Sequence, residues 1–272
     1  MISAILGICL LLVVTADVVM STLGVGANGP LAPRVARGTF CLIRCLPKQN
    51  WVHRVCGPLV VVSIGAAWII LMCLSWTLIL SGQVGSVVSQ SSGAPAGLLE
   101  KAIYAGHLLS TLGGGTYESS GAPWGVVATL IGVSGMVVLT LSVSFVYSTT
   151  QAVSTGRAIL ALSDVHPPGT TQFSQILLPQ LATLVAQIKA IPYALYFSTV
   201  REERRLPQKL AQLRAHPEIS AQDRRNLDIL LRELPGLEHV PQDQFDETFE
   251  EWPRSRASGR GGCPSPVHSG WS

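Results

Sequence analysis

The sequence predicts an all-α membrane protein with three transmembrane helices. A re-entrant helix and loop lie between the second and third, and cytoplasmic helices follow. Only 13% of the 272 residues are charged, about half of the roughly 25% found in soluble domains. The mean hydropathy is +0.40, and the apolar residues are clustered in long runs. This composition excludes a disordered chain, a coiled coil and a disulfide-rich secreted module.

The first apolar run lies within residues 1–25 and is long enough to cross the ~30 Å core of a bilayer. Because it is too long for a signal peptide and lacks a basic start, we expect an N-terminal transmembrane helix. Asp17 lies inside this run, where an ionised carboxylate facing lipid costs about 2.5–3.5 kcal/mol. We therefore expect Asp17 to face protein or water, either in an interhelical contact or in an ion path.

Residues 26–56 form a basic connector that carries five Lys or Arg side chains and no acid. The positive-inside rule places this connector in the cytoplasm, which puts the N-terminus outside the cell and the C-terminal region inside. Cys41, Cys45 and Cys56, with His53 nearby, have the side chains of metal ligands. They lack the close cysteine pairs of zinc sites, so we predict reduced thiols and no metal site.

Residues 57–148 contain two further apolar spans, at residues 58–81 and 124–148. The intervening residues 82–95 predict an exposed loop, and residues 96–110 predict a helix that is too short to cross the membrane. A half-length helix followed by glycines indicates a re-entrant segment, which is tolerated only where protein or water surrounds it.

The region after the third span is predicted to be cytoplasmic. Residues 149–239 predict helices, of which the apolar segment 171–200 is interrupted by Pro179 and Pro192. That segment fits an amphipathic helix packed under the membrane or on a sister chain better than a fourth span. Residues 240–272 are predicted to be a disordered tail.

A glycine-rich stretch, Thr-Leu-Gly-Gly-Gly at residues 111–115, follows the short helix directly. Carbonyl oxygens replace the water of a cation when successive carbonyls of an extended chain point the same way. That arrangement needs φ angles of alternating sign, which glycine tolerates. The negative end of the short helix would also favour cations. The candidate ion-binding residues are Thr111, Leu112, Gly113, Gly114 and Gly115.

The succession of span, loop, short helix, TLGGG and span resembles the pore module of potassium channels, whose filter reads T-V/L-G-Y-G. With the GPLAPR connector and an extra leading span, the chain is similar to bacterial one-pore potassium channels over about residues 5–150. The resemblance implies passive flow of potassium or other monovalent cations through a homotetramer. It also implies that residues 111–114 supply carbonyl rings and Gly115 closes the filter, with no cofactor besides the permeating ion.

The chain departs from the potassium-channel pattern at two positions. Gly114 stands where the filter tyrosine is expected, and Thr116 stands where an aspartate usually follows, with Glu118 as a displaced substitute. Tyr104 and His107 lie three residues apart on the short helix, where they either support the filter or make ordinary packing contacts.

Other functions fit the sequence less well. The chain contains no GxxxxGK[ST], HExxH or GxSxG motif, so we predict that it is not an enzyme. A net charge of +3 gives no reason to expect a nucleic-acid partner. The alternative to a channel is a non-conducting channel-like membrane scaffold or auxiliary subunit that binds a partner through the tail. Gly132 and Gly135 in the third span fit either a gating hinge or close helix packing.

Overall fold

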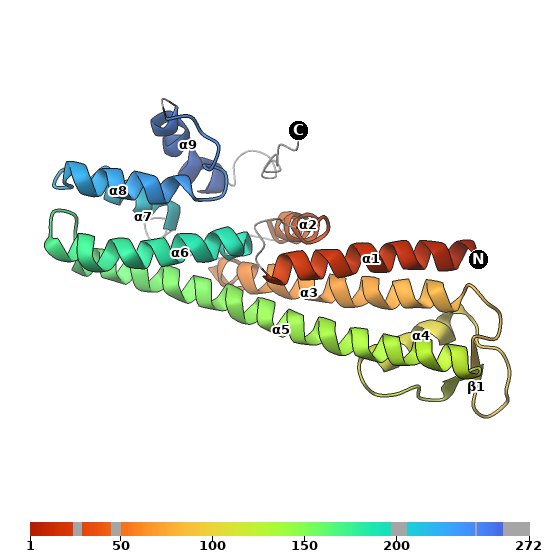
Figure 1. The fold of residues 1–272 in the computed structure, drawn as a ribbon. Coiled ribbons are helices and arrows are strands. Elements are labelled where there is room, and N and C mark those ends of the chain that lie inside the picture. Colours follow the sequence, from red (N-terminus) through yellow and green to blue (C-terminus); the bar gives the residue numbers. More distant parts are fainter. Residues whose placement is uncertain (24–28, 45–49, 197–205, 243, 258–272) are drawn as a thin grey trace. The chain divides into compact units, whose positions relative to one another are not determined.

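The computed structural model describes residues 1–23, 29–44, 50–196, 206–242 and 244–257 (Figure 1). The chain divides into two compact units, one of residues 1–35 with 62–146 and one of residues 36–61 with 147–272. The helices of the first part of the chain are α1 (Ile2–Leu23), α2 (Ala32–Arg44), α3 (Asn50–Leu80), α4 (Leu98–Leu109) and α5 (Ala122–Val165).

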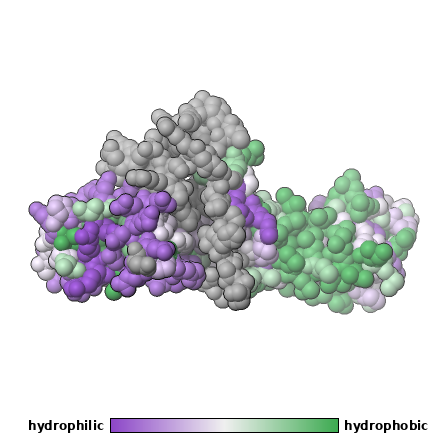
Figure 2. Space-filling view, turned by 90° about the horizontal axis from the view of Figure 1, so that it is seen from above, coloured by the Kyte–Doolittle hydropathy of each residue, from purple (hydrophilic) through white to green (hydrophobic). Residues whose placement is uncertain are grey.

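Three helices are long and apolar enough to cross a membrane, which confirms the number predicted for the part of the chain that is described. They are α1, the Cys56–Leu80 part of α3, and α5. Helix α5 has 44 residues and so extends ~66 Å, about twice the thickness of a bilayer core. The span predicted at residues 124–148 lies within α5, and the helix continues beyond it to Val165, shortly before Pro167 and Pro168. Figure 2 shows the corresponding apolar surface in green.

The first unit, called the membrane unit below, is held by close packing between its helices. A Cβ on Gly7 of α1 would lie 2.7 Å from the carbonyl oxygen of Ser75 in α3, so only glycine permits this approach. Trp68 of α3 meets Phe145 of α5 edge to face, with 5.3 Å between the ring centroids. Small residues at crossing points and paired aromatic rings are typical of helix packing in membranes.

Asp17 fixes the start of α2. Its carboxylate is fully buried and accepts hydrogen bonds from the backbone N–H groups of Leu31 (2.6 Å) and Ala32 (3.1 and 3.2 Å). It also accepts one from Nε1 of Trp68 at 2.7 Å. A carboxylate at the positive end of a helix satisfies N–H groups that have no partner within the helix. Of the two roles predicted for Asp17, the structure therefore has the interhelical contact.

A two-stranded antiparallel sheet replaces the fully irregular loop that was expected before α4. Strand β1 (Val87–Ser89) pairs with β2 (Tyr117–Ser119), and Val87 lies opposite Ser119. Backbone bonds from Gln90 to Thr116 and from Ser120 to Ser86 extend the pairing on both sides. The sheet thus joins the segment before α4 to the segment after residues 111–115.

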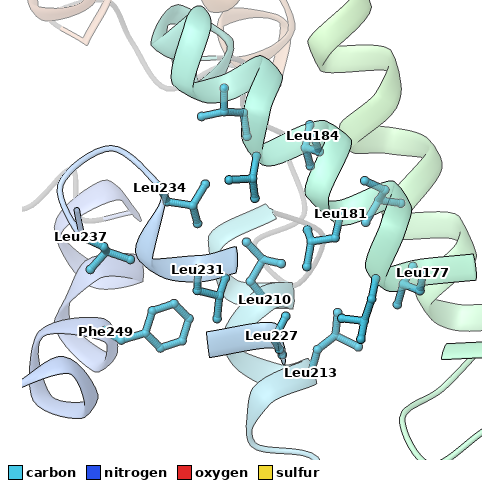
Figure 3. Packing of buried hydrophobic residues seen from close by; sticks show 14 of the residues in the cluster. Leu177, Leu181, Leu184, Leu210, Leu213, Leu227, Leu231, Leu234, Leu237 and Phe249 are labelled. Atoms are coloured by element: carbon cyan, nitrogen blue, oxygen red, sulfur yellow. The ribbon is translucent and has the colours of Figure 1, made fainter. Parts of the chain in front are cut away.

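The second unit is a helical assembly with its own apolar core. Besides most of α2 and the beginning of α3, its elements are the C-terminal part of α5, a π-helical turn η1 (Phe173–Leu177), α6 (Leu178–Ala190), a 3₁₀ turn η2 (Pro192–Tyr196), α7 (Leu206–Arg214), α8 (Ala221–Arg232) and α9 (Phe245–Ala257). Figure 3 shows Leu181 of α6 directed toward Leu210 of α7, and Leu184 of α6 and Leu231 of α8 belong to the same buried cluster. The apolar face of α6 is therefore covered within this chain and not, as expected, by the membrane or a sister chain.

Helix α9 corrects the prediction of disorder for residues 245–257, whereas residues 258–272 of the predicted tail lie outside the described part of the chain. Phe245, Phe249 and Trp252 are each at most 4% exposed and belong to the core of the second unit. Arg214 of α7 lies over the rings of Phe245 and Phe249 at 5.4 Å from each centroid and pairs with Asp228 of α8. Aromatic burial and this cation–π contact thus hold a helix whose other residues are mostly polar or charged.

Candidate functional site

Helix α4 is anchored at its beginning to the end of α3. Oε2 of Glu100 accepts a hydrogen bond from the N–H of Gly97 at 2.7 Å, which caps the helix. Lys101 is only 5% exposed, and its Nζ donates to the carbonyl oxygens of Leu80 and Gln83 at 3.0 Å each. Burial lowers the pKa of Lys101. A cation at the C-terminal end of α3 is favourable, because the last carbonyls of a helix carry partial negative charge.

The end of α4 is closed by a Schellman motif with an unusual residue in it. The N–H of Thr111 donates to the carbonyl of Leu108 at 3.1 Å, and the N–H of Leu112 donates to that of His107 at 3.0 Å. Thr111 has a φ of 64°, the conformation that glycine usually supplies at this position. A β-branched residue there is strained, and such strain costs about 1–3 kcal/mol.

The φ angles alternate in sign along residues 111–115. They are positive at Thr111 (64°), Gly113 (85°) and Gly115 (66°), and Leu112 and Gly114 are absent from the described residues with positive φ. The alternation of φ signs is one of the two features expected for carbonyl groups that point the same way. The other, an extended chain, is interrupted by turns at Thr111 and at residues 115–116.

The three glycines of the loop are needed for different reasons. Gly113 is required for its positive φ and not for space, because a Cβ there would meet nothing within 4 Å. Gly114 is glycine for space, because a Cβ would lie 2.5 Å from the carbonyl oxygen of Tyr117 and 2.9 Å from Cε2 of Tyr104. Gly115 has both constraints, since Nδ1 of His107 would be 2.5 Å away.

The carbonyl oxygens of residues 111–115 differ in whether they accept a backbone hydrogen bond. That of Gly114 accepts the N–H of Tyr117 at 3.3 Å. Within the described ranges, no backbone N–H donates to the carbonyls of Thr111, Leu112, Gly113 or Gly115. Leu112 is 76% exposed. Four of the five predicted ion-binding residues thus have main-chain oxygens available for a ligand.

The predicted supporting residues lie unequally close to the loop. Tyr104 is 3% exposed, and its ring lies against Gly114. Burial raises the pKa of its hydroxyl, a hydrogen bond with Ser119 opposes this, and the charge of Glu118 adds to it. His107 lies against Gly115, whereas Glu118 points to solvent from β2.

Three contributors to this site were missed in the sequence. Lys101 stands in an otherwise weakly charged region, and that isolation was the available signal. Ser119 and the two strands gave little signal, because each strand has only three residues. Tyr117 of β2 lies near Glu100 of α4, because the charge of Glu100 adds to the effect of burial in raising the pKa of the Tyr117 hydroxyl.

Close packing accounts for one of the two candidate hinge glycines. A Cβ on Gly135 would overlap the backbone of Leu109, with Cα of Leu109 at 2.6 Å. A Cβ on Gly132 would lie 3.8 Å from the carbonyl of Leu108, an ordinary contact distance. Gly135 is therefore the point where α5 crosses the end of α4, and a hinge at Gly132 stays a prediction.

Among the described side chains no group of three suitable metal ligands occurs, and the absence of a metal site stays a prediction. Cys41 is disulfide-bonded, which corrects the expectation of a reduced thiol there, while Cys56 is a buried free thiol. Cys45 and the side chain of His53 lie outside the described part of the structure.

Comparisons with known proteins support membrane character and little more. No family model matches the chain, and no solved structure matches it. The chain is similar to the uncharacterized membrane protein YdjJ of Bacillus subtilis, with 27% identity over 133 residues. This match covers 44% of the chain and 39% of YdjJ, so the chain spans about two fifths of the relative's length.

Proposed function

We propose that this chain is a subunit of a passive membrane channel for potassium or other monovalent cations. The observation that carries the proposal is the loop at residues 111–115, which combines alternating φ signs with free carbonyl oxygens. The loop begins at the end of a 12-residue helix, between two helices long enough to span a bilayer.

The chemistry of conduction is the exchange of water for protein oxygens. Carbonyl dipoles and the hydroxyl of Thr111 stand in for the hydration shell of a cation, so that the ion enters without a large desolvation cost. The C-terminal end of α4 directs its partial negative charge toward the loop. The strained φ of Thr111 supports the proposal, because strained residues tend to persist at functional positions.

The proposed assembly is a homotetramer in the cell membrane. One loop of five residues cannot surround an ion, so several copies must share an axis, and closed rings are the common solution for identical subunits. By the positive-inside rule, the basic residues of 26–56 favour a cytoplasmic connector, with the N-terminus and residues 82–123 outside and the region after the third span inside.

The alternative function would depend on the second unit. Its helices enclose a core of their own, with Leu227, Leu231, Leu234 and Leu237 each fully buried. A compact unit of this kind is suited to binding a partner. A non-conducting scaffold or an auxiliary subunit would keep the membrane helices and use this unit for recognition.

The test compares two glycine substitutions in liposomes that contain the purified protein. Gly113 and Gly93 both have positive φ (85° and 66°) and open space where a Cβ would stand, so alanine introduces similar strain at either site. We expect potassium flux in the wild type, a loss of at least about tenfold in G113A and a change within about twofold in G93A, where a tenfold effect corresponds to ~1.4 kcal/mol.

Two results would contradict the channel proposal. Absence of cation flux from correctly folded wild-type protein would favour the scaffold. Equal losses in G113A and G93A would show that backbone strain anywhere in the extramembrane segments impairs the protein, without a special role for residues 111–115.

A further inference from the structure

Cys41, in the last turn of α2, is disulfide-bonded. The other cysteines of the described residues are free thiols, namely Cys9, Cys56 and Cys73. The partner of Cys41 therefore lies outside the described part of the chain. A disulfide at this point conflicts with the charge pattern, because residues 26–56 carry five basic side chains and no acidic one. That pattern favours the cytoplasm, where thiols are kept reduced.

The surroundings of Cys41 favour the reactive form of a thiol. Arg37 precedes Cys41 by four residues and Arg34 precedes it by seven, so the three positions share one face of α2. The helix contains no acidic residue. Positive charge near a cysteine stabilises its thiolate, which is the form that attacks a disulfide. Cys41 is half-buried and Arg34 is exposed, so reagents in water can reach this face.

The free thiols of the described residues lie in different surroundings. Cys9 belongs to α1, and Cys56 and Cys73 belong to the part of α3 that is long and apolar enough to cross a membrane. Cys56 is also only 6% exposed. Structural thiols in apolar surroundings are inert, because the thiolate is unfavourable there. Cys41 differs from them because it lies on a basic helix between two such spans.

The disulfide acts at the end of α2 that Asp17 does not hold. The carboxylate of Asp17 accepts the N–H groups of Leu31 and Ala32 and so fixes the beginning of the helix. Only residues 45–49 separate the other end from α3. The covalent bond restrains this second end, and reduction removes the restraint directly before a membrane span.

We propose that Cys41 is a reversible thiol–disulfide switch, oxidised in the structure and reduced by cytoplasmic thiols. The thiolate of one external thiol attacks a sulfur of the disulfide, the S–S bond breaks, and the displaced protein sulfur leaves as a thiolate that takes up a proton. A second external thiol attacks the mixed disulfide and releases the other protein thiol. Two external thiols thus become one disulfide while the protein gains two thiols, and an oxidising disulfide drives the reverse exchange.

The experiment counts the free thiols of the full chain in cells that express it. Cells are quenched with acid, and the denatured chain is alkylated with a maleimide–polyethylene glycol reagent that shifts its gel mobility once for each thiol. We expect untreated cells to give additions at all six cysteines, the thiol oxidant diamide to remove two of them, and dithiothreitol to restore both. A disulfide already present in untreated cells would be a permanent one, and an unchanged count after diamide would mean that none forms. Either result would overturn the inference.

Single serine variants assign the bond to its cysteines. C41S should lose one addition in untreated cells and no more after diamide. C9S is the matched control, because Cys9 is a free, exposed thiol, and it should lose one addition at the start and two more after diamide. C45S and C263S change the two cysteines that lie outside the described residues. One of them should behave as C41S and the other as C9S, and any other division would contradict the proposal, even if C41S does not fold.

Hydrogen exchange in detergent micelles tests whether the bond restrains α2. Dithiothreitol should speed exchange of the backbone amides of residues 41–44 at least about fivefold, since reduction makes local opening of the last turn easier. The amides of Leu31 and Ala32 should not change, because their hydrogen bonds to Asp17 remain. C41S should exchange at the faster rate with or without dithiothreitol. Equal exchange of the oxidised and reduced wild type would refute the switch, and neither experiment depends on ion flux.

Discussion

The buried carboxylate of Asp17 gives the sharpest prediction about what holds the membrane unit together. In D17N the side chain keeps its shape, but its amide group must direct N–H donors at the N–H of Trp68 or at the first amides of α2. Two donors then face each other in a site with no exposed surface at Asp17. The substitution also removes the negative charge from the start of α2.

The magnitude follows from the bonds that are lost. Hydrogen bonds to a charged group contribute about 1.5–3 kcal/mol, and a buried donor left without a partner costs about 1–3 kcal/mol. A charge at the start of a helix adds about 0.3–1 kcal/mol. Because these contributions overlap, we expect D17N to lower the free energy of unfolding by about 3 kcal/mol, of which about half is coupled to Trp68.

A double-mutant cycle measures that coupling. Unfolding in mixed micelles, followed by far-ultraviolet circular dichroism, is compared for D17N, W68F and the double variant. W76F is the matched control, because Trp76 is also buried in α3 but donates to the neutral Ser134 hydroxyl at 3.0 Å. We expect a D17N–W68F coupling of about 1.5 kcal/mol and a D17N–W76F coupling below about 0.5 kcal/mol. Equal couplings would refute the role given to Asp17.

The remaining predictions concern the loop and its supports. T111G should raise the free energy of unfolding by about 1 kcal/mol, since it relieves the positive φ, and should lower cation flux; a less stable variant would show that Thr111 is unstrained. G135A should destabilise the protein by about 2 kcal/mol because its Cβ overlaps Leu109, whereas G132A should be neutral or stabilising by up to about 1 kcal/mol; similar effects at both sites would contradict the packing described. K101M leaves two carbonyls at the end of α3 without their buried donor, so thermal unfolding should show a loss of about 2 kcal/mol, and an unchanged midpoint would count against the anchor.

The number of membrane helices was readable from the sequence because uninterrupted apolar length is a strong signal. The two runs at 58–81 and 124–148 needed only hydropathy to be recognised. The end of a span is not the end of its helix, since α5 continues for 17 residues beyond 148 through a segment without a helix-breaking proline. Hydropathy marks where a span meets the membrane surface and does not mark where its helix ends.

The spacing of aromatic residues in the C-terminal segment indicates a helix, although its average composition does not. Residues 240–253 are acidic, and this predicted disorder. Phe245, Phe249 and Trp252 nevertheless recur at spacings of four and three residues, which is the period of one helical face. Their burial against the core of the second unit is the tertiary contribution that average composition does not reveal.

The position of the loop could be predicted from its residues. The reason why each of its three positions requires glycine could not. The pattern Gly113-Gly114-Gly115 indicates conformational freedom at all three positions, whereas the structure needs it at two and needs space at Gly114. That space is taken by Tyr104, which comes from a different element. Contacts between elements depend on the tertiary fold, so sequence spacing alone left both interpretations of Tyr104 open.

The convergence of several loops on one axis is the central claim and can be measured directly. A spin-labelled non-canonical amino acid at Leu112, which is 76% exposed, reports distances between copies of the full chain in lipid nanodiscs by pulsed electron resonance. A fourfold ring predicts two short distances in a ratio of about 1.4, for adjacent and diagonal subunits. A single long distance, or no distance between copies, would contradict the claim that residues 111–115 surround a shared ion path.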